Sequence, residues 1–447
     1  LVIKAAILFL FMKETLVEKA KTILKNNNQG GFTIPCEGLY PFQWNWDSGF
    51  IAVGLAHIDI ELAKEELQSL LDAQWENGFI PHIVFHNDSD SYFPGPDFHL
   101  SKLHKDASKK YRTTGMTQPP VLGFVLQEMY KIAEDKEAIL KFIDTIIDKI
   151  YKKHEYLYNN RDPKNEGLVY IWHNWESGTD NSPIWDEVWD TMSDIPQYTF
   201  ERKDTTHIDA SQRPSNKEYN YYIHLIEVAK AGNYEESVIA EKSPFLIQDP
   251  LFNAMLLASN EALIDLYKKL GREENISQLE EWTLKTKQSL NEKLFDEELG
   301  AYMHYDLRNE KRIQKITSSS YAPLFSSAPE EKQLKLILES YTQKFATPNL
   351  YACASFDPTH EDFNPKKYWR GPIWVNLNWL IYKGLLKHNQ QELANNIKTD
   401  TVELIEKFGF YEYFNPQREI STENESNGCG GLNFSWSAAL ILDILKA

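Results

Sequence analysis

Cysteine and metal-binding motifs are scarce in this sequence. Its 447 residues include three widely spaced cysteines, Cys36, Cys353 and Cys429, so no disulfide framework or closely spaced metal site is visible. The histidines lack the close pairing of a zinc site, and there is no EF-hand loop, phosphate-binding glycine loop or dinucleotide fingerprint. We therefore expect a reduced, cytoplasmic protein that works without metal or cofactor.

Basic charge and long apolar runs are also limited. With 47 Lys and Arg against 65 Asp and Glu, the formal net charge is -18, which repels nucleic acid and anionic membrane surfaces. The apolar start of the chain is a dozen residues long, well short of the roughly 20 needed to cross a bilayer. It has no preceding basic segment and no small-residue cleavage site. We interpret residues 1–11 as a non-native or disordered extension, with Met12 as the natural start.

Helical periodicity recurs along the chain, whereas convincing strand alternation is almost absent. Between the periodic segments lie intervals rich in Gly, Pro, Asn and aromatic residues, with no Ser-rich or Gly-rich linker. We therefore predict one all-α domain over residues 12–447, in which roughly twelve helices pair into a closed ring of hairpins. The predicted helices span residues 16–24, 51–56 running into 60–71, 121–132, 138–150, 219–231, 251–270, 276–294, 332–341, 373–386, 391–408 and 435–445.

Two intervals break this pattern. Residues 187–217 are acidic and resemble no regular element, so we interpret them as an inserted loop that covers one side of a pocket. Residues 418–431 are polar and end in glycines, which predicts a flexible segment. Both are candidate lids, with an ordinary surface loop as the alternative.

Aromatic residues are abundant, with 12 Trp, 23 Tyr and 23 Phe, which favours a lined pocket. The stretch YIWHNWESGTDNSPIWD, residues 170–186, sets acids and small turn residues among Trp172, Trp175 and Trp185. A tight turn at Ser177-Gly178 would present Asp180 from a loop. The tryptophans would desolvate this carboxyl, raise its pKa and keep it protonated as a general acid.

Other interpretations of the same stretch stay open. Asp180 alternatively helps to cap a helix that starts near Pro183, although Ser182 is better placed for that. Glu176, Asp186 and Glu187 are rival acids.

A second aromatic segment, GFYEYFNPQ at residues 409–417, carries one isolated acid, Glu412. An acid in so apolar a setting either faces water or is held for a task. Glycoside hydrolysis requires two carboxyls, one to protonate the leaving oxygen and one to activate water or attack carbon. Glu412 is therefore the candidate base that deprotonates the attacking water, with a solvated loop residue as the alternative.

Polar and aromatic residues also gather at predicted loop-to-helix junctions. In LYPFQWNWDSGF, Trp44, Trp46 and Asp47 precede a helix expected to begin near Phe50. Asp47 either caps that helix or binds sugar hydroxyls beside the aromatic rings. Gln118, Arg213 and the segment YWRGPIW at residues 368–374 occupy similar junctions, and polar groups at junctions on one rim can converge.

Seven motifs together resemble glycoside hydrolase family 63, most closely its compact bacterial mannosylglycerate and glucosylglycerate hydrolases. In chain order they are WNWDSGF, TQPP, NWESGTDNSP, DPLFNAM, YWRGPIW, GFYEYFNP and GLNFSWS. The likeness covers nearly everything from Met12 to the C-terminus. It implies an (α/α)6 barrel and an inverting mechanism without metal or cofactor, with Asp180 as general acid and Glu412 as general base.

The resemblance also implies a set of substrate-binding residues. Tyr92 would lie on a mobile loop over the pocket. A glycosylglycerate also needs a cation or several donors for its carboxylate, and Arg213 is the nearest candidate. The implied pocket residues are Tyr40, Trp44, Trp46, Asp47, Tyr92, Gln118, Trp175, Gly178, Arg213, Tyr368 and Trp369.

The sequence thus predicts an inverting α-glycosidase that acts on a small α-glucoside or α-mannoside, above all glucosylglycerate or mannosylglycerate, giving free sugar and glycerate. Its partner is this small glycoside, and both a monomer and a homo-oligomer are compatible with the sequence. An α-glucosidase or trehalase-like hydrolase is the alternative within the class. A sugar epimerase would need a histidine pair that the motifs lack, and a silent sugar-binding protein would need neither acid.

Overall fold

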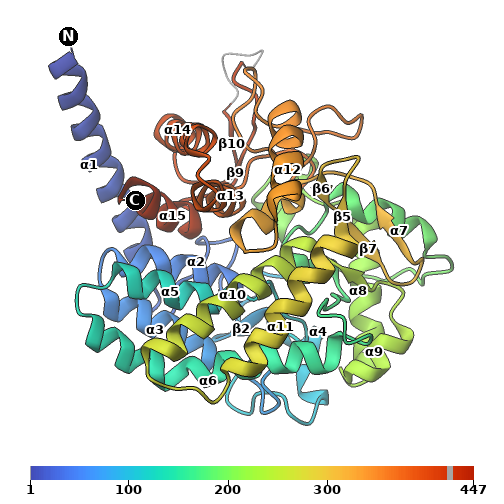
Figure 1. Ribbon diagram of the computed structural model, residues 1–447. Helices are drawn as coiled ribbons and strands as arrows, with labels where there is room; N and C mark the ends of the chain where they lie inside the picture. Colours follow the sequence, from blue (N-terminus) through green and yellow to red (C-terminus); the bar gives the residue numbers. More distant parts are fainter. Residues whose placement is uncertain (1, 420–425, 447) are drawn as a thin grey trace.

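Helices dominate the protein (Figure 1). The computed structural model describes residues 2–419 and 426–446, with side chains from Glu14 onward. The longer helices are α1 (Val2–Asn27), α2 (Asn45–Ala56), α3 (Ile60–Leu71), α5 (Leu122–Ile132), α6 (Lys136–Arg161), α8 (Asn216–Ala231), α10 (Pro250–Lys269), α11 (Ile276–Ser289), α12 (Glu331–Lys344), α13 (Val375–Lys387), α14 (Gln391–Phe408) and α15 (Ser435–Lys446). Shorter ones are α4 (Pro96–His99), α7 (Asp186–Thr191), α9 (Glu236–Lys242) and the 3₁₀ helix η7 (Ser318–Phe325).

Six of these elements form a closed inner ring. Contacts run from α2 to α5, then to α10, η7, α13 and α15, and from α15 back to α2. Each inner element carries one outer partner, α3 on α2, α6 on α5, α11 on α10, α12 on η7, α14 on α13 and α1 on α15. The inner helices are buried nearly all round, because they pack against both ring neighbours and an outer helix. The predicted (α/α)6 barrel is confirmed.

Every helix predicted from periodicity is present, and several begin at recognisable caps. The side chain of Ser215 accepts a hydrogen bond from the backbone N–H of Glu218, and the Glu218 carboxylate accepts one from the Ser215 N–H at the start of α8. Asp249 accepts from two backbone N–H groups at the start of α10, with Pro250 at the first helical position.

The strand prediction was incomplete, because within the described ranges ten strands of two to five residues form four small antiparallel sheets. Strands this short leave no alternation that a pattern search can detect. They are β1 (Gln43–Trp44), β2 (Ile83–Phe85) and β3 (Arg112–Thr113); β4 (Ile247–Gln248), β7 (His304–Asp306) and β8 (Lys311–Ile313); β5 (Phe295–Asp296) and β6 (Ala301–Tyr302); and β9 (Tyr411–Phe414) and β10 (Gly428–Leu432).

Both ends of the described chain lie on the same side of the barrel (Figure 1). Figure 1 shows the first half of α1 (dark blue) projecting from the body and its second half beside α15 (dark red). Residues 2–11, interpreted above as an extension, continue the backbone helix of α1. No helix in the described ranges is both long and apolar enough to cross a membrane.

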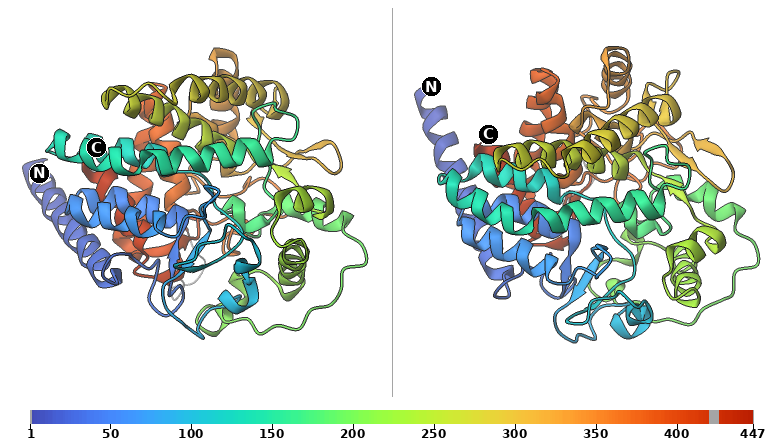
Figure 2. Two further views of the ribbon diagram at one scale, coloured as in Figure 1. Left: turned by 90° about the horizontal axis from the view of Figure 1, so that it is seen from below. Right: turned by 60° about the horizontal axis from the view of Figure 1, so that its bottom comes forward.

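The two candidate lids have different structures. Of residues 418–431, residues 420–425 lie outside the described ranges, and 428–431 belong to β10 and are not part of a flexible loop. The interval 187–217 is not wholly irregular, because α7 covers its first residues and single 3₁₀ turns follow at Asp204–Thr206 (η4) and Ala210–Gln212 (η5). Figure 2 shows this green segment sweeping round the side of the molecule. Phe200 stacks on Phe93, with ring centroids 6.1 Å apart.

Candidate active site

A pocket of about 730 Å³, including the space at its mouth, lies where several inner helices begin. Trp46 is in the first turn of α2 and Trp436 in the first turn of α15, while Trp374 immediately precedes α13. Gln118 precedes α5, and Glu412 enters from strand β9. The junctions singled out in the sequence therefore do converge on one rim.

The structure brings every predicted site residue to this pocket. Their roles remain predictions, but their placement in one cavity is observed. The thirteen are Tyr40, Trp44, Trp46, Asp47, Tyr92, Gln118, Trp175, Gly178, Asp180, Arg213, Tyr368, Trp369 and Glu412. Nine further lining residues are Pro35, Leu39, His82, Phe93, Asp204, Tyr219, Trp374, Phe434 and Trp436.

The turn predicted at Ser177-Gly178 is present and requires glycine. Gly178 has φ of 73° and ends the short 3₁₀ helix η2 (Asn174–Ser177). A Cβ at this position would lie 2.4 Å from the ring of Trp46, so no other residue fits without displacing that ring. The turn thus seats the Asp180 loop directly on the first turn of α2.

The carboxyl of Asp180 lies in the pocket wall, where it is buried and accepts one long side-chain hydrogen bond from the protein. Burial raises its pKa from 3.8 to about 7, although the Arg213 charge and the Tyr368 hydroxyl oppose this rise. The Tyr368 hydroxyl donates to Oδ2 over a long 3.3 Å. Of the three tryptophans expected to desolvate it, Trp175 lines the pocket, but Trp172 and Trp185 are packed in the core outside the pocket lining.

The rival acids of the same stretch do not line the pocket. Glu176 is fully buried and pairs with Arg161 at 2.9 Å. Asp186 accepts two hydrogen bonds from Arg370, at 2.9 and 2.6 Å. Glu187 pairs with a lysine at the surface. Asp180 also does not cap a helix, since the 3₁₀ helix η3 (Pro183–Trp185) follows Ser182 as its N-cap residue, with no side-chain cap bond.

Glu412 is held on both carboxylate oxygens. Tyr40 donates its hydroxyl to Oε1 at 2.8 Å, and the Gly431 N–H on β10 donates to Oε2 at 3.1 Å. Nη1 of Arg213 lies 3.6 Å from Oε1. Burial raises the pKa of Glu412, and Arg213, the Gly431 N–H and Tyr40 all act to lower it. Gly430, with φ of 70°, leaves room for the carboxylate, because a Cβ there would lie 2.4 Å from Oε2.

These surroundings push the two carboxyls toward different protonation states. The Arg213 charge lowers the pKa of both carboxyls, but Asp180 accepts one long side-chain hydrogen bond, whereas Glu412 accepts two shorter hydrogen bonds. Burial raises the pKa of both groups, so the difference lies in the partners of each anion. The arrangement favours a neutral Asp180 beside an ionised Glu412, the pairing that acid and base catalysis needs.

Asp47 does not cap a helix near Phe50, because α2 already begins at Asn45. Backbone donors at this end are satisfied by tertiary partners, Asn45 N–H by the His82 carbonyl at 2.9 Å and Trp46 N–H by Gln118 Oε1 at 3.1 Å. These bonds replace a local cap, which is why the sequence did not reveal the helix start. Asp47 faces the pocket instead, and burial raises the pKa of its carboxyl well above the ordinary value.

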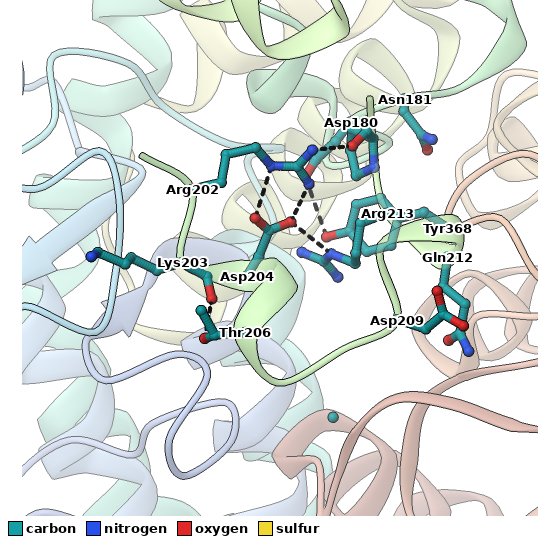
Figure 3. Close-up of polar contacts among 12 residues, drawn as sticks. Asp180, Asn181, Arg202, Lys203, Asp204, Thr206, Asp209, Gln212, Arg213 and Tyr368 are labelled. Atoms are coloured by element: carbon teal, nitrogen blue, oxygen red, sulfur yellow. Dashed lines mark hydrogen bonds and ion pairs between the residues drawn. The ribbon is translucent and has the colours of Figure 1, made fainter. Parts of the chain in front are cut away.

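Arg213 connects the two halves of the site. Its guanidinium lies over the Tyr368 ring, 4.1 Å from the centroid, and Nη2 donates to the Tyr40 hydroxyl at 3.0 Å. Nε donates to Asp204 Oδ2 at 3.1 Å (Figure 3). Nη1 is buried without a hydrogen-bond partner among the described residues. Within the described lining, Arg213 is the only arginine or lysine.

Comparison with known proteins gives this geometry a family. The model of the mannosylglycerate hydrolase MGH1-like glycoside hydrolase domain matches residues 40–437. The chain belongs to this family. It is 38% identical to a mannosylglycerate hydrolase of Thermus thermophilus, over 95% of this chain and 99% of that one. It is 32% identical to the glucosylglycerate hydrolase of Mycolicibacterium hassiacum, over 97% of this chain and 98% of that one.

A solved family structure agrees with the fold. A family 63 mannosylglycerate hydrolase of Thermus thermophilus, in complex with Tris and D-glycerate, superposes with a TM-score of 0.87 at 37% identity. The match covers 96% of this chain and 99% of that one. As a member of the MGH1-like family, the chain is a glycoside hydrolase.

Some lining residues of this MGH1-like hydrolase were missed in the sequence, and only part of them had a signal. Trp374, Phe434 and Trp436 stand inside the motifs YWRGPIW and GLNFSWS, so treating whole motifs as pocket lining would have found them. Asp204 lies in the interval 187–217, where no periodicity indicates which side chains point inward. His82 follows a short loop into β2 and had no comparable signal. In the described ranges, no cluster of three or more His, Cys, Asp and Glu is arranged to hold a metal ion.

Proposed function

We propose that this MGH1-like hydrolase cleaves an α-linked glycosylglycerate, mannosylglycerate or glucosylglycerate, into free sugar and glycerate with inversion at the anomeric carbon. Asp180 protonates the glycosidic oxygen, and Glu412 deprotonates the water that attacks the anomeric carbon from the opposite face. The observation that carries the proposal is one buried cation, Arg213, whose charge acts on both carboxyls in a strongly acidic protein.

The protonation states that the surroundings favour for the two carboxyls support these roles. With a pKa of about 7, Asp180 keeps its proton in a substantial fraction of molecules at neutral pH. Glu412 is stabilised as an anion by Tyr40, the Gly431 N–H and Arg213. It can therefore accept a proton from water while Asp180 delivers one to the leaving oxygen. After one turnover Asp180 is ionised and Glu412 is protonated, and proton exchange with solvent restores the starting state.

Arg213 supports the acidic aglycone. A buried guanidinium with an unpartnered Nη1 is a strong donor toward a carboxylate. The Tyr40 and Tyr368 hydroxyls beside it already donate to Glu412 and Asp180, which leaves Nη1 as the donor that this cluster offers to a carboxylate. The Thermus thermophilus relative was solved with D-glycerate bound, and the curated relatives are named for the two glycerate glycosides.

Aromatic faces and short polar groups provide for the sugar. Trp46, Trp175 and Trp369 line the pocket, and tryptophan faces suit the apolar faces of sugar rings. Asp47 presents a carboxyl for sugar hydroxyls, and Tyr92 closes one side by edge contact with Trp44 at 5.3 Å between ring centroids.

The three free, buried cysteines accord with a cytoplasmic location.

The test is to incubate the enzyme with a panel of α-glycosides and follow the reaction by proton NMR. We expect release of β-configured sugar from mannosylglycerate or glucosylglycerate, and little from trehalose or neutral glycosides. Initial release of the α-anomer would refute inversion, and equal rates on neutral glycosides would refute the acidic aglycone.

Two variants test the assigned roles. Asp180→Asn and Glu412→Gln each remove one proton-transfer group while keeping shape, and we expect kcat to fall by at least about 10³-fold, in the upper range for acid and base catalysis. Circular dichroism should show an unchanged fold. Near-normal turnover by either variant would contradict its assignment.

A further inference from the structure

We propose that Asp204 is the positioning residue for Arg213, and that through Arg213 it determines the preference of the enzyme for an anionic aglycone. Asp204 lies in the interval 187–217, on the 3₁₀ turn η4, and its carboxylate reaches the pocket wall. The inference rests on the proposed function, because it concerns how the cation for the glycerate carboxylate is held.

Asp204 lies between two guanidinium groups (Figure 3). Arg202 donates to it through Nε at 3.0 Å and Nη2 at 2.7 Å, which is a two-point, fork-like contact. From the other side, Arg213 donates through Nε at 3.1 Å. All three side chains are about 90% buried or more. The two cations together lower the pKa of Asp204, so it is held as an anion despite its burial.

Arg202 is itself fixed in place. Its Nη1 donates to the Pro214 carbonyl, one residue after Arg213, and its guanidinium stacks on the Tyr219 ring at 4.2 Å from the centroid. Asp204 therefore ties Arg213 to a rigid second arginine and to the start of α8. These buried contacts fix the guanidinium of Arg213 itself, in addition to holding the loop against the protein.

The position of Arg213 matters because a competing anion is close. Nη1 of Arg213 lies 3.6 Å from Glu412 Oε1, just outside hydrogen-bonding distance. Without Asp204, the Nε side of Arg213 loses its anion, and Glu412 is the nearest remaining carboxylate partner. The two groups already lie within ion-pair distance, and a shift of a few tenths of an ångström would turn this contact into a hydrogen bond. It would consume the free donor for the substrate and stabilise Glu412 as an anion, which makes it a weaker base.

The positioning role and simple electrostatics predict opposite changes in D-glycerate affinity when Asp204 is neutralised. Replacing Asp204 by a neutral residue removes a negative charge beside the binding site for an anion, so simple electrostatics predicts tighter binding of D-glycerate. Positioning predicts weaker binding, because the guanidinium is no longer held with Nη1 free. An asparagine keeps one acceptor oxygen, which cannot satisfy the fork of Arg202 and Nε of Arg213 together at full charge.

The experiment compares Asp204→Asn with wild type by titration calorimetry of D-glycerate and by kinetics on an anionic and a neutral α-glycoside of the same sugar. We expect D-glycerate to bind about tenfold more weakly, a change that corresponds to about 1.4 kcal/mol. The value of kcat/KM should fall more for the anionic than for the neutral glycoside. Arg202→Gln, which removes the other anchor of Asp204, should shift both quantities in the same direction.

Asp209→Asn is the matched control. Asp209 lies in the same segment and is exposed, and its carboxylate accepts a hydrogen bond from the Ser211 N–H. Its loss removes the same charge without touching Arg213, so D-glycerate binding should be unchanged.

The outcomes separate the two proposals. If wild type binds D-glycerate and Asp204→Asn binds it equally or more tightly, the positioning role is overturned while the proposed function stands. If kcat/KM falls by the same factor on both glycosides, Asp204 supports the fold of the site and not its preference. A wild type that neither binds D-glycerate nor prefers the anionic glycoside overturns both.

Discussion

The hydrogen bond from Tyr368 to Asp180 leads to a prediction about pH. A general acid must carry its proton, so activity should fall at high pH as Asp180, with a pKa of about 7, loses it. The Tyr368 hydroxyl stabilises the charged form and holds this pKa down. Tyr368→Phe removes that donor, so the pKa of Asp180 should rise and the alkaline limb of the kcat profile should move to higher pH.

The size of this shift follows from the geometry. A hydrogen bond to a charged group contributes about 1.5–3 kcal/mol, but this one is 3.3 Å long, beyond the usual range for O–H···O contacts. We therefore take the lower end, about 1.5 kcal/mol, and since one pKa unit corresponds to about 1.4 kcal/mol, the limb should move by about one unit. At pH 8 a full unit would increase the protonated fraction about fivefold.

The assay is kcat measured from pH 5 to 9 on the substrate found by NMR. The matched control is Tyr222→Phe, because the Tyr222 hydroxyl donates to the backbone carbonyl of Asp180 at 3.2 Å and not to its carboxyl. The control should leave the limb where it is, even if the rate falls. A limb that stays in place or moves to lower pH in Tyr368→Phe would refute the reasoning.

Two further predictions concern the loop that carries Asp180. Glu176→Gln leaves Arg161 without one of its buried anionic partners, so the free energy of unfolding measured in urea should fall by about 3 kcal/mol. The control Glu187→Gln removes a surface ion pair and should lower it by less than about 1 kcal/mol. Equal losses in the two variants would contradict this reasoning. Gly178→Ala places a methyl group 2.4 Å from the Trp46 ring, and a displacement of about 1 Å should lower kcat/KM about 100-fold. Wild-type kinetics in the alanine variant would show that the ring yields freely.

The barrel was predictable from sequence because its helices have clear apolar faces, and the errors have physical causes. The helix expected at residues 138–150 continues to Arg161 as α6. Its later turns carry polar residues that break the apolar pattern, yet Lys153 and His154 are buried, and His154 Nδ1 lies 2.7 Å from Asn260 Oδ1. A pattern search treats such residues as exposed, although both side chains lie in the interior, where Lys153 Nζ and His154 Nε2 have no hydrogen-bond partner among the described residues.

The acids of the Asp180 loop could be ranked only weakly for a related reason. Glu176 and Asp180 are four residues apart in one turn, and spacing alone cannot say which faces the pocket. The answer depends on Arg161, which lies at the end of α6 and pairs with Glu176 behind the loop. Asp204 gave no signal because its two arginine partners are defined by a loop path with no periodicity. The sequence could predict glycine turns and isolated acids among aromatic residues. It could not predict side-chain contacts between residues far apart in the chain.

The hairpin of β9 and β10 has a consequence for the order in which activity arises during synthesis. Glu412 is held from one side by Tyr40 near the start of the chain, and from the other by Gly431 on β10; Trp436 in α15 donates from Nε1 to its backbone carbonyl at 3.4 Å. The same α15 closes the ring against α2. A nascent chain that has emerged only as far as β9 lacks the Gly431 and Trp436 contacts to Glu412. It cannot assemble the base until residues 428–436 have left the exit tunnel, so glycoside cleavage should begin only once that stretch has emerged.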